Sequence, residues 1–377
     1  MLIGIDGNEA NQPNKVGIGQ VAFNVLWQLY KIDKKNVYQV FLKSPPLSDL
    51  PPERAGWKYE VFGPKKIWTQ LALPINLWLK KTKPDVFFSP SHYAPRFSPV
   101  PTVIYLMDLW HHRHPEQFNK KDLYQLTKWE EYSVKNAKHI LTISQFSKSE
   151  ILDIYKVPEN KVTVAYPGYT KFQIPNSKHQ INSKIQNIKQ KYNIKGDYFL
   201  YLGTLQPKKN IEGLIKAFEC LIHNSKFIIQ LVIAGKKGWQ YDKIFDLVKE
   251  LKLEDKIVFT GFVSEEEKPF LMAGVKAFVF PSFYEGFGIP VLESFNLGVP
   301  VMVANAGSLP EVGGKAAIYC DPDNIKSIAS ALEKVLSLNA KQRNEIINLG
   351  YQQAVKFSWE KCTKQVLETL EKNAIKN

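Results

Sequence analysis

The sequence predicts an α/β protein of two domains, each built around a mainly parallel sheet. Its 377 residues are enough for two domains of ordinary size, each with its own core. Short apolar runs alternate with helical segments in both halves, which is typical of parallel strands covered by helices on both faces. Between the halves, residues 169–196 contain six lysines and no acidic residue. We interpret this stretch as a linker followed by one helix, which places the domain boundary near residue 167.

Short apolar runs mark the expected strands. In the first half they are residues 2–5, 38–42, 85–88, 102–106, 140–143 and 162–165. In the second half they are residues 199–203, 228–233, 257–260, 278–280, 299–304 and 316–320. Helices are expected at residues 21–30, 181–192, 211–221, 324–338, 341–357 and 358–372.

The composition favours a soluble protein of the cytoplasm. Hydrophobic residues make up 44% of the chain and charged residues 23%, as in ordinary globular domains. The three cysteines, Cys220, Cys320 and Cys362, are scattered without metal-binding spacing and are interpreted as reduced thiols. The apolar run at residues 2–5 is too short for a signal peptide, and no window approaches the roughly 18 to 20 apolar residues of a membrane span.

The net charge of +14 indicates an anionic partner. Nucleic acid, anionic lipid and a phosphate-bearing substrate all fit this charge. No nucleic-acid-binding module appears in the sequence, so we expect no nucleic-acid partner and favour lipid and diphosphate.

The stretch from residue 278 to 313 holds the main candidate site. A buried strand at 278–280 leads into a loop with Gly286 and Gly288, and a helix is expected to open at Pro290 with Glu293 in its first turn. Glu285 on the loop and Glu293 have seven residues between them. Carboxylates accept hydrogen bonds from vicinal hydroxyls, and the free amides of a helix N-terminus face negative charge. This predicts a site for a polyol that carries a diphosphate; alternatively, Glu293 caps its own helix and Glu285 is a solvated loop residue.

Two further turns join a strand to a helix. Gly17 and Gly19 precede the helix at 21–30, and Lys209 precedes the helix at 211–221. A lysine beside a helix N-terminus can neutralise a diphosphate. Taken alone, the glycine pair also fits a tight turn with nothing bound, and the lysine also fits a solvated side chain.

The segment PKKIWTQLALPINLWLKKTKP, residues 64–84, sets tryptophans and leucines between lysine pairs. Such a segment can lie flat on an anionic membrane surface. It can equally be an ordinary amphipathic helix packed on the sheet with solvated ends. Peripheral membrane contact is therefore a hypothesis that the sequence raises.

A polar cluster, MDLWHHRHPEQF, follows the strand at 102–106, where open α/β sheets bind ligands. It contains His111, His112 and His114. Adjacent histidines do not easily converge on one ion, and no Cys or acidic ligand has suitable spacing, so we expect no metal here.

Three segments occur in order in the second half: SFYEGFGIPVLES, GVPVMVAN and SLPEVGG. Together they resemble the donor-site signature of the GT-B glycosyltransferases of family 4, retaining enzymes that include bacterial mannosyl- and glucosyltransferases of polysaccharide assembly. The resemblance covers nearly the whole chain. It implies a GT-B fold, with two facing Rossmann-like domains and an interdomain cleft. Residues 1–167 would form the acceptor domain, completed by a C-terminal helix at about 358–377, and residues 168–357 the donor domain.

The resemblance also implies roles for individual residues. Glu285 would hold hydroxyls of the transferred sugar, Glu293 the ribose and Lys209 the phosphates, while the backbone of residues 261–263 would read the base. The implied donor-binding set is Gly17, Gly19, Thr204, Lys208, Lys209, Gly261, Phe262, Val263, Glu285, Gly286, Phe287, Gly288, Ile289 and Glu293.

The sequence departs from the family pattern at two positions. Met107 stands where the family commonly has histidine, and either Asp108, which is kept, or His111 is a candidate substitute. Thr204 stands where many members have arginine, and Lys208 can supply part of the lost charge, although an ammonium does not copy a guanidinium fork. The implied catalytic residues are Asp108, Lys209 and Glu285.

The activity that the resemblance implies is transfer of a hexosyl unit of mannose or glucose type, with retention, from a UDP or GDP sugar to a glycan or lipid-linked acceptor hydroxyl. It would serve cell-surface polysaccharide or glycolipid synthesis. No side chain presents itself as a covalent nucleophile, so a front-face route is expected, without metal or cofactor. The alternatives are a nucleotide-sugar epimerase of the same fold, which needs no acceptor, a phosphorylase, for which no pyridoxal-binding lysine is identified, and a catalytically silent sugar-nucleotide-binding relative.

Overall fold

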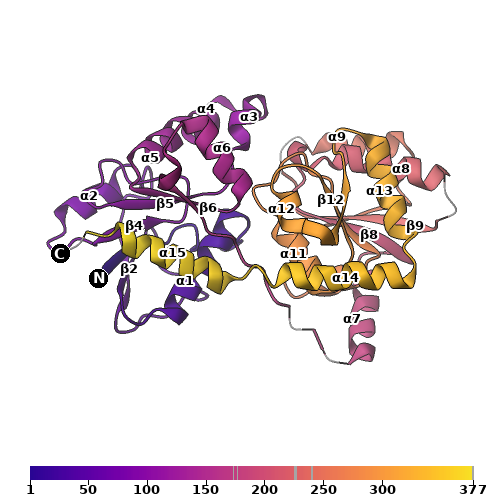
Figure 1. The fold of residues 1–377 in the computed structure, drawn as a ribbon, viewed down its shortest axis with the longest axis horizontal. Coiled ribbons are helices and arrows are strands. Elements are labelled where there is room, and N and C mark those ends of the chain that lie inside the picture. The colour runs from indigo at the N-terminus through magenta and orange to yellow at the C-terminus, as the bar shows by residue number, and fades with distance from the viewer. Residues whose placement is uncertain (173, 176, 225–226, 239–240, 376–377) are drawn as a thin grey trace. The chain divides into compact units, whose positions relative to one another are not determined.

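A computed structural model describes residues 1–172, 174–175, 177–224, 227–238 and 241–375 of the chain. The chain divides into two compact units (Figure 1). Unit 1 comprises Met1–Gly168 and Phe357–Asn377, and unit 2 comprises Tyr169–Lys356. Each unit is a parallel sheet with helices packed against it, and each is described separately below.

Within the described residues, unit 1 contains a seven-stranded sheet in the order β3-β2-β1-β4-β5-β6-β7, and every neighbouring pair is parallel. Its strands are β1 (Leu2–Asp6), β2 (Val37–Leu42), β3 (Trp57–Val61), β4 (Val86–Ser89), β5 (Thr102–Leu106), β6 (His139–Thr142) and β7 (Val162–Val164). Its α-helices are α1 (Ile18–Ile32), α2 (Ala72–Leu79), α3 (Trp110–Arg113), α4 (Lys120–Tyr124), α5 (Glu130–Asn136), α6 (Gln145–Tyr155) and α15 (Trp359–Asn373).

The last helix, α15, belongs to unit 1 although it follows unit 2 in the chain. It begins at a cap in which the Ser358 side chain accepts a hydrogen bond from the Lys361 amide. Its buried side, which includes Trp359, Cys362 and Val366, packs with α1 and with strands β4 and β6. In Figure 1 it is the yellow helix beside α1.

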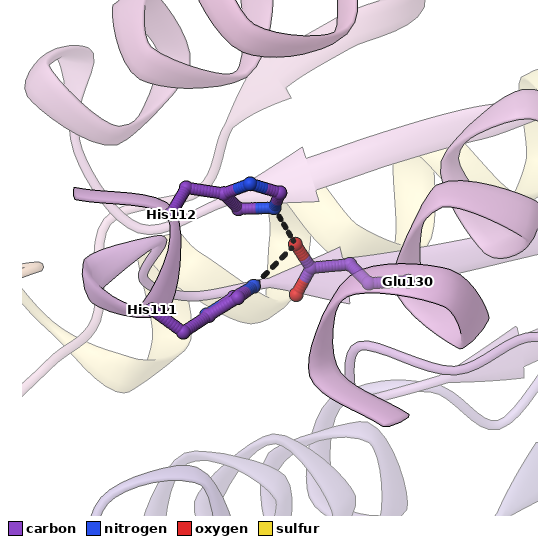
Figure 2. Close-up of side chains that lie close together, drawn as sticks. All are labelled: His111, His112 and Glu130. Carbon is purple, nitrogen blue, oxygen red and sulfur yellow. Dashed lines mark ion pairs between the residues drawn. The ribbon is translucent and has the colours of Figure 1, made fainter. Parts of the chain in front are cut away.

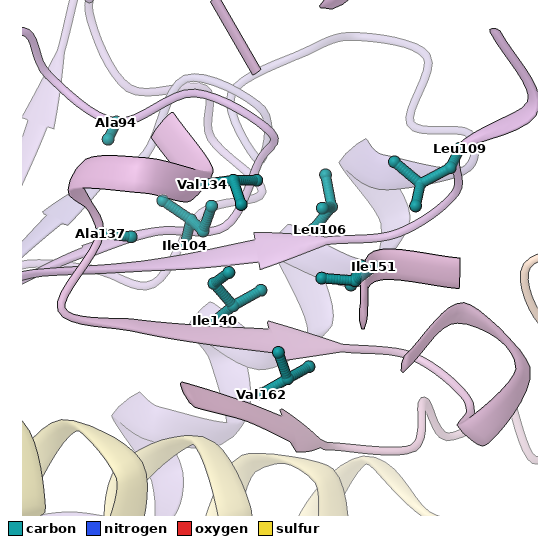
Figure 3. Packing of buried hydrophobic residues seen from close by; sticks show 9 residues of the cluster. All are labelled: Ala94, Ile104, Leu106, Leu109, Val134, Ala137, Ile140, Ile151 and Val162. Atoms are coloured by element: carbon teal, nitrogen blue, oxygen red, sulfur yellow. The ribbon is translucent and has the colours of Figure 1, made fainter. Parts of the chain in front are cut away.

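The core of unit 1 beside the end of the sheet is made of aliphatic side chains (Figure 3). Ile104 and Leu106 of β5 and Ile140 of β6 point from the sheet toward Val134 of α5 and Ile151 of α6. These residues are fully buried, so the two helices are anchored by the removal of apolar area from water. This packing fixes the loops that follow β5 and β6.

Within the described residues, unit 2 contains a six-stranded parallel sheet in the order β10-β9-β8-β11-β12-β13. Its strands are β8 (Asp197–Leu202), β9 (Ile229–Ala234), β10 (Ile257–Gly261), β11 (Ala277–Phe280), β12 (Val301–Ala304) and β13 (Ala317–Cys320). Its α-helices are α7 (Lys178–Lys191), α8 (Ile211–Asn224), α9 (Asp242–Glu250), α10 (Lys268–Ala273), α11 (Ile289–Asn296), α12 (Leu309–Gly313), α13 (Ile325–Leu336) and α14 (Ala340–Ala354).

Both sheets reverse their direction of winding in the middle. In unit 1 the reversal lies between β1 and β4, and in unit 2 between β8 and β11. Open α/β sheets bind ligands outside the carboxyl ends of the strands at such a reversal. The loops after β8 and β11 are therefore the first place to look for a site in unit 2.

The predicted α/β fold with parallel sheets is confirmed. Each predicted strand is present, with ends that differ by at most two residues. The sequence analysis missed β3, which lies at the edge of its sheet beside β2 and has Trp57 as its one buried residue. An edge strand of this kind lacks the continuous apolar run by which the other strands were recognised.

Candidate functional site

Lys209 and Glu285 form an ion pair at the reversal point of the second sheet. Lys209 ends a short 3-10 turn after β8, and Glu285 lies on the loop after β11. The Lys209 Nζ atom donates a hydrogen bond of 2.5 Å to Oε1 of Glu285. The two side chains are only 12% and 9% exposed. An acidic and a basic group thus meet in a partly enclosed position, where charge interactions are stronger than in open water.

The Glu285 loop is held by the segment that follows β12. The Ser308 hydroxyl donates to the carbonyl oxygens of Glu285 and Phe287 at 2.9 and 2.8 Å, and is fully buried. Gly307 adopts a φ of +59°, and a Cβ atom there would lie 2.9 Å from the Glu285 carbonyl oxygen. Glycine is required at this position because a side chain would meet both strain and backbone. The SLPEVGG motif therefore supports the loop that carries Glu285.

The Lys209 turn is fixed to the same loop. The Phe283 amide donates to the Lys208 carbonyl oxygen at 2.9 Å. Asn210, in a left-handed conformation, donates from Nδ2 to the carbonyl oxygens of Pro281 and Pro322 at 3.1 and 2.7 Å. Asn tolerates this conformation better than most residues. The sequence analysis did not single out Asn210 or Ser308, because their partners are distant in sequence.

Glu293 lies deeper than predicted. Helix α11 begins at Ile289 after Gly288, whose φ is +120°, so Glu293 is its fifth residue. The prediction of a helix opening at Pro290 with Glu293 in the first turn was wrong, because Gly288 ends the loop one residue earlier. The Glu293 side chain makes no cap. It is fully buried and lies beside Lys268, whose Nζ atom is 2.9 Å from both carboxylate oxygens.

The residues between the two glutamates form the entry to α11. Gly286, Phe287 and Gly288 are buried, and Ile289 and Pro290 are half-buried. At the start of α11, Pro290 has no N–H and the Val291 amide donates to the Gly288 carbonyl oxygen at 3.0 Å, so within this turn the Ile289 amide is left without a partner inside the helix, as at a helix N-terminus. The structure thus places Lys208, Lys209, Glu285, residues 286–289 and Glu293 along the adjoining ends of β8 and β11.

The remaining predicted donor residues of unit 2 lie at the end of another strand or, within the described residues, form no hydrogen bond or ion pair with the Lys209–Glu285 pair. Gly261 is the last residue of β10 and Phe262 and Val263 follow it; this strand is separated from β11 by β9 and β8. Phe262 is 53% exposed, and Lys236 Nζ lies 4.7 Å from the centroid of its ring. Thr204 is half-buried, and its carbonyl oxygen accepts a hydrogen bond from Tyr201.

In unit 1, the predicted residues follow β1 and β5. Gly17 is the N-cap of α1 with a φ of +52°, and Gly19 is buried against the Glu9 carbonyl oxygen. Asp108 is half-buried after β5 and accepts a hydrogen bond from the Trp110 amide at 3.2 Å. Both loops lie at the carboxyl edge of the sheet, where unit 1 would bind a ligand.

A buried carboxylate gathers three histidines beside the β5 loop, and Figure 2 shows two of them, His111 and His112. Glu130 Oε1 lies 3.3 Å from Nε2 of His111 and 3.5 Å from Nε2 of His112, and Figure 2 shows both rings turned toward it. Its other oxygen, Oε2, lies 2.5 Å from Nδ1 of His92. The Tyr155 hydroxyl donates to Oε1 and lies 2.8 Å from Nε2 of His112.

This cluster corrects the argument made from sequence about metal. Adjacent histidines do converge here, and Glu130, eighteen residues after His112, provides the acidic ligand that spacing did not reveal. Within the described ranges, His111, His112 and Glu130 form a group whose ligand atoms lie within 4.8 Å of one another. However, the Tyr155 hydroxyl bridges His112 and Glu130, so a hydrogen-bonded network also satisfies most of these atoms.

The contacts within the cluster shift the pKa values of Glu130 and His92 in opposite directions. Burial alone would raise the pKa of the Glu130 carboxyl, but the contacts with His111, His112 and His92 outweigh it and hold this pKa well below its usual range. Burial would lower the pKa of His92, yet its hydrogen bond to Glu130 raises it. His111 is 2% exposed and faces Glu130, which argues against its use as a substitute for the histidine absent at Met107.

The segment at residues 64–84 has features of both structures that the sequence left open, a helix packed on the sheet and an apolar surface that faces outward. Trp68, Leu73 and Leu77 are buried in a core cluster with Phe41 and Phe87, as an amphipathic helix on a sheet requires. A second set of large apolar side chains from the same segment stays exposed: Ile67, Leu71, Ile75, Trp78 and Leu79. None of the helices in the described part of the chain is long and apolar enough to cross a bilayer.

Two Rossmann-like units, with a lysine and two glutamates at the reversal point of the second, are the arrangement expected of a GT-B glycosyltransferase. Comparison with known proteins identifies the family. Residues 25–170 match the model of Glycosyltransferase Family 4, and residues 184–353 match the model of Glycosyl transferases group 1. The chain belongs to glycosyltransferase family 4 and is a glycosyltransferase of polysaccharide synthesis.

The chain is similar to curated mannosyltransferases. It is 35% identical over 292 residues to O-antigen chain mannosyltransferase B of Escherichia coli, which covers 77% of this chain and 74% of that protein. It is 31% identical to O-antigen chain mannosyltransferase RfbU of Salmonella typhimurium, over 60% of this chain and 58% of that protein. These relatives do not favour an epimerase or a silent relative.

The fold is shared with solved structures. Anabaena Alr3699/HepE in complex with UDP and glucose superposes with a TM-score of 0.75, over 98% of this chain and 99% of that one, at 17% identity. The lipopolysaccharide glycosyltransferase WaaG superposes with a TM-score of 0.71 at 14% identity, over 98% of this chain and 99% of that one. The GT-B fold predicted from the sequence is confirmed.

Proposed function

We propose that this glycosyltransferase moves a hexosyl unit, in the first place mannosyl, from a nucleoside diphosphate sugar to a hydroxyl of a glycan or lipid-linked acceptor. The mannosyl choice is supported by the names of the curated relatives, which are mannosyltransferases. The polarity of the site supports the class of donor, because it combines lysines for phosphate with two acidic groups for hydroxyls.

The observation that carries the proposal is the Lys209–Glu285 pair at the reversal point of the second sheet. The Lys209 ammonium can transfer its hydrogen bonds from Glu285 to a diphosphate oxygen. Glu285 is then available to accept hydrogen bonds from sugar hydroxyls, while the amides that open α11 face the phosphates. Glu293 accepts from the ribose hydroxyls, and the backbone of residues 261–263 contacts the base.

The reaction we propose keeps the configuration at the anomeric carbon. The bond between that carbon and the β-phosphate oxygen breaks, and a bond to the acceptor oxygen forms on the same face. The acceptor proton passes to the leaving phosphate oxygen. Lys209 and the α11 amides stabilise the negative charge that grows on the diphosphate, which is the larger part of the catalysis that these residues can supply. Asp108, after β5 in unit 1, is the candidate for holding the transferred sugar.

We propose that no metal or cofactor takes part, because Lys209 and helix amides already supply positive charge for the diphosphate. The His111, His112 and Glu130 group offers a direct check. Dialysis against a chelator should leave nucleotide release unchanged. A loss of activity that added zinc restores would contradict this part of the proposal.

We also propose that unit 1 contacts an anionic membrane through the exposed side of α2, on the cytoplasmic face. Leu71, Ile75, Trp78 and Leu79 are spaced by four, three and one residues, so they share one helix side, and Leu79 is 80% exposed. Lys65, Lys66 and Lys81 are exposed beside them. Apolar side chains flanked by lysines suit an interface that contains anionic lipid, where a lipid-linked acceptor would be presented.

The experiment that tests the proposed function is a panel of UDP and GDP sugars, with released nucleotide as the readout and a glycan or polyprenyl-linked acceptor present. We expect release with one donor, and a loss of roughly 100-fold or more in Lys209→Ala and Glu285→Ala. Lys276→Ala is the matched control, because Lys276 pairs with Asp197 at the amino end of the sheet, away from the site. Wild-type rates in both site variants would refute the site assignment.

A further inference from the structure

Lys268 is a buried lysine of unit 2, the unit that contains the Lys209–Glu285 pair. Lys268 is the first residue of α10 and is only 6% exposed. Its Nζ atom lies 2.9 Å from both carboxylate oxygens of Glu293. The same atom lies 5.3 Å from the centroid of the Phe172 ring and 3.6 Å from the exposed carboxylate of Glu265. Lysine is almost never buried to this degree unless it is paired.

The buried pair is incompletely satisfied. Lys268 donates a hydrogen bond to Oε1 of Glu293, whereas the buried Oε2, although it lies 2.9 Å from the same Nζ atom as an ionic contact, accepts no hydrogen bond among the described residues. Placing two charges in the interior is costly, and apolar residues of similar volume would often stabilise the fold as well or better. A buried carboxylate oxygen that has an ionic contact but accepts no hydrogen bond needs an explanation beyond packing. An acceptor that is kept open for a ligand hydroxyl explains it.

We propose that Lys268 is a positioning residue for the sugar nucleotide: it fixes the Glu293 carboxylate through Oε1 and so presents Oε2 to a hydroxyl of the nucleotide ribose. The inference rests on the proposed function and adds a residue that the signature of the site does not contain. Lys268 lies between β10 and β11, so one strand separates it in the chain from the two glutamates, and it reaches Glu293 from a different helix.

The charge of Glu293 depends on this contact. Burial raises the pKa of the Glu293 carboxyl above its ordinary value, and Lys268 opposes that rise, while the more distant Glu265 adds to it. Without the ammonium, nothing would oppose the effect of burial, so the pKa of the Glu293 carboxyl would rise further and the protonated form would persist to higher pH. A protonated carboxyl accepts a weaker hydrogen bond from a hydroxyl than a carboxylate does.

The test is the pH dependence of nucleotide binding, measured by calorimetry with GDP and UDP on the full-length protein. Wild type should bind with an affinity that changes little from neutral to alkaline pH. Lys268→Met should bind about tenfold more weakly at neutral pH, because charge-assisted hydrogen bonds are roughly twice as strong as neutral ones, and should recover as the pH rises. Lys268→Arg should restore the flat profile of wild type.

Two further variants separate positioning from a structural effect. Lys268→Met combined with Glu293→Gln cannot ionise at residue 293, so its binding should be weak at every pH. Lys191→Met removes an exposed lysine that pairs with Glu267, the residue before Lys268, and should leave binding unchanged. Thermal unfolding of each variant establishes that it is folded.

The inference is overturned if Lys268→Met binds the nucleotide as wild type does, or if its weak binding shows no recovery at alkaline pH. It is also overturned if the pH dependence persists in the double variant, because another group would then titrate. Absence of nucleotide binding or release by wild type would instead refute the proposed function, so the two failures are distinguishable.

Discussion

The Nζ atom of Lys209 lies 2.5 Å from Oε1 of Glu285, and each side chain is the other's ionic partner within unit 2. The pair joins the turn after β8 to the loop after β11 across the reversal point of the sheet. A sugar diphosphate would therefore compete with Glu285 for the lysine, and with the lysine for Glu285. The Lys209–Glu285 contact holds the two side chains close together before the donor binds, and the donor must replace that contact when it binds.

Breaking this pair should lower stability. Lys209→Met leaves Glu285 without its partner at a position that is only 9% exposed, and we expect it to reduce the free energy of unfolding by about 3 kcal/mol. The double variant Lys209→Met with Glu285→Gln should recover most of this loss, because no unpaired charge remains. Chemical denaturation of the four proteins in the cycle measures the coupling; additive losses would show that the contact is not a stabilising pair.

Asp6, at the end of β1, should make the fold less stable as the pH rises. Burial raises its pKa from 3.8 to about 6, against the hydrogen bonds from the amide and side chain of Asn8. Between pH 3.8 and about pH 6, Asp6 therefore keeps its proton in the folded state and has lost it in the unfolded state. The free energy of unfolding falls as the pH rises through this range. Asp6→Asn should be more stable than wild type at neutral pH by up to about 3 kcal/mol, with a smaller difference at pH 4.

The matched control for Asp6 is Asp255→Asn, an exposed aspartate on the loop before β10. It should change the free energy of unfolding little at either pH. If Asp6→Asn proves less stable than wild type at neutral pH, the ionised form of Asp6 is supported by the fold, and our account of its burial is wrong.

Glu130 should be required for the stability of unit 1. Glu130→Gln removes the charge that partners His92, and with both groups buried we expect a loss of about 3 to 5 kcal/mol. The lowered pKa of Glu130 contributes stability above about pH 4.3, and the raised pKa of His92 contributes fully below about pH 6.5. The deficit of the variant should thus be largest near about pH 6 and shrink in alkaline solution. A deficit that grows toward alkaline pH would contradict a protonated His92.

The exposed side of α2 should control membrane binding. Trp78→Ser combined with Leu79→Ser removes two exposed apolar side chains and should weaken sedimentation with vesicles that contain phosphatidylglycerol by about tenfold or more. Binding to neutral vesicles should be weak for wild type as well. Tyr351→Ser, which changes an exposed aromatic residue of unit 2, is the control. Equal sedimentation of the double variant and wild type would remove this surface from the proposal.

Alternating apolar runs predict the architecture because each buried parallel strand leaves its own local signal. The edge strand β3 was missed since only Trp57 among its residues is buried. Local signals also allowed the SFYEGFGIPVLES segment and Lys209 to be named as site residues from the sequence, because they belong to local turns with recognisable chemistry.

The partners of these residues could not be named in advance. Lys268 reaches Glu293 from another helix, and Ser308 and Asn210 clamp the Glu285 loop through backbone carbonyl oxygens. Glu130 meets His92, His111 and His112 only because α5 packs on β5. These contacts depend on tertiary packing and leave no periodic or spacing signal in the chain.

The most direct test of the donor site is a crystal structure of the protein bound to its sugar nucleotide. The account predicts a diphosphate within hydrogen-bonding distance of Lys209 and the amides that open α11, with sugar hydroxyls on Glu285 and ribose hydroxyls on Glu293. A donor bound elsewhere, or bound at this edge with the Lys209–Glu285 ion pair intact and both carboxylates turned away from it, would contradict the account.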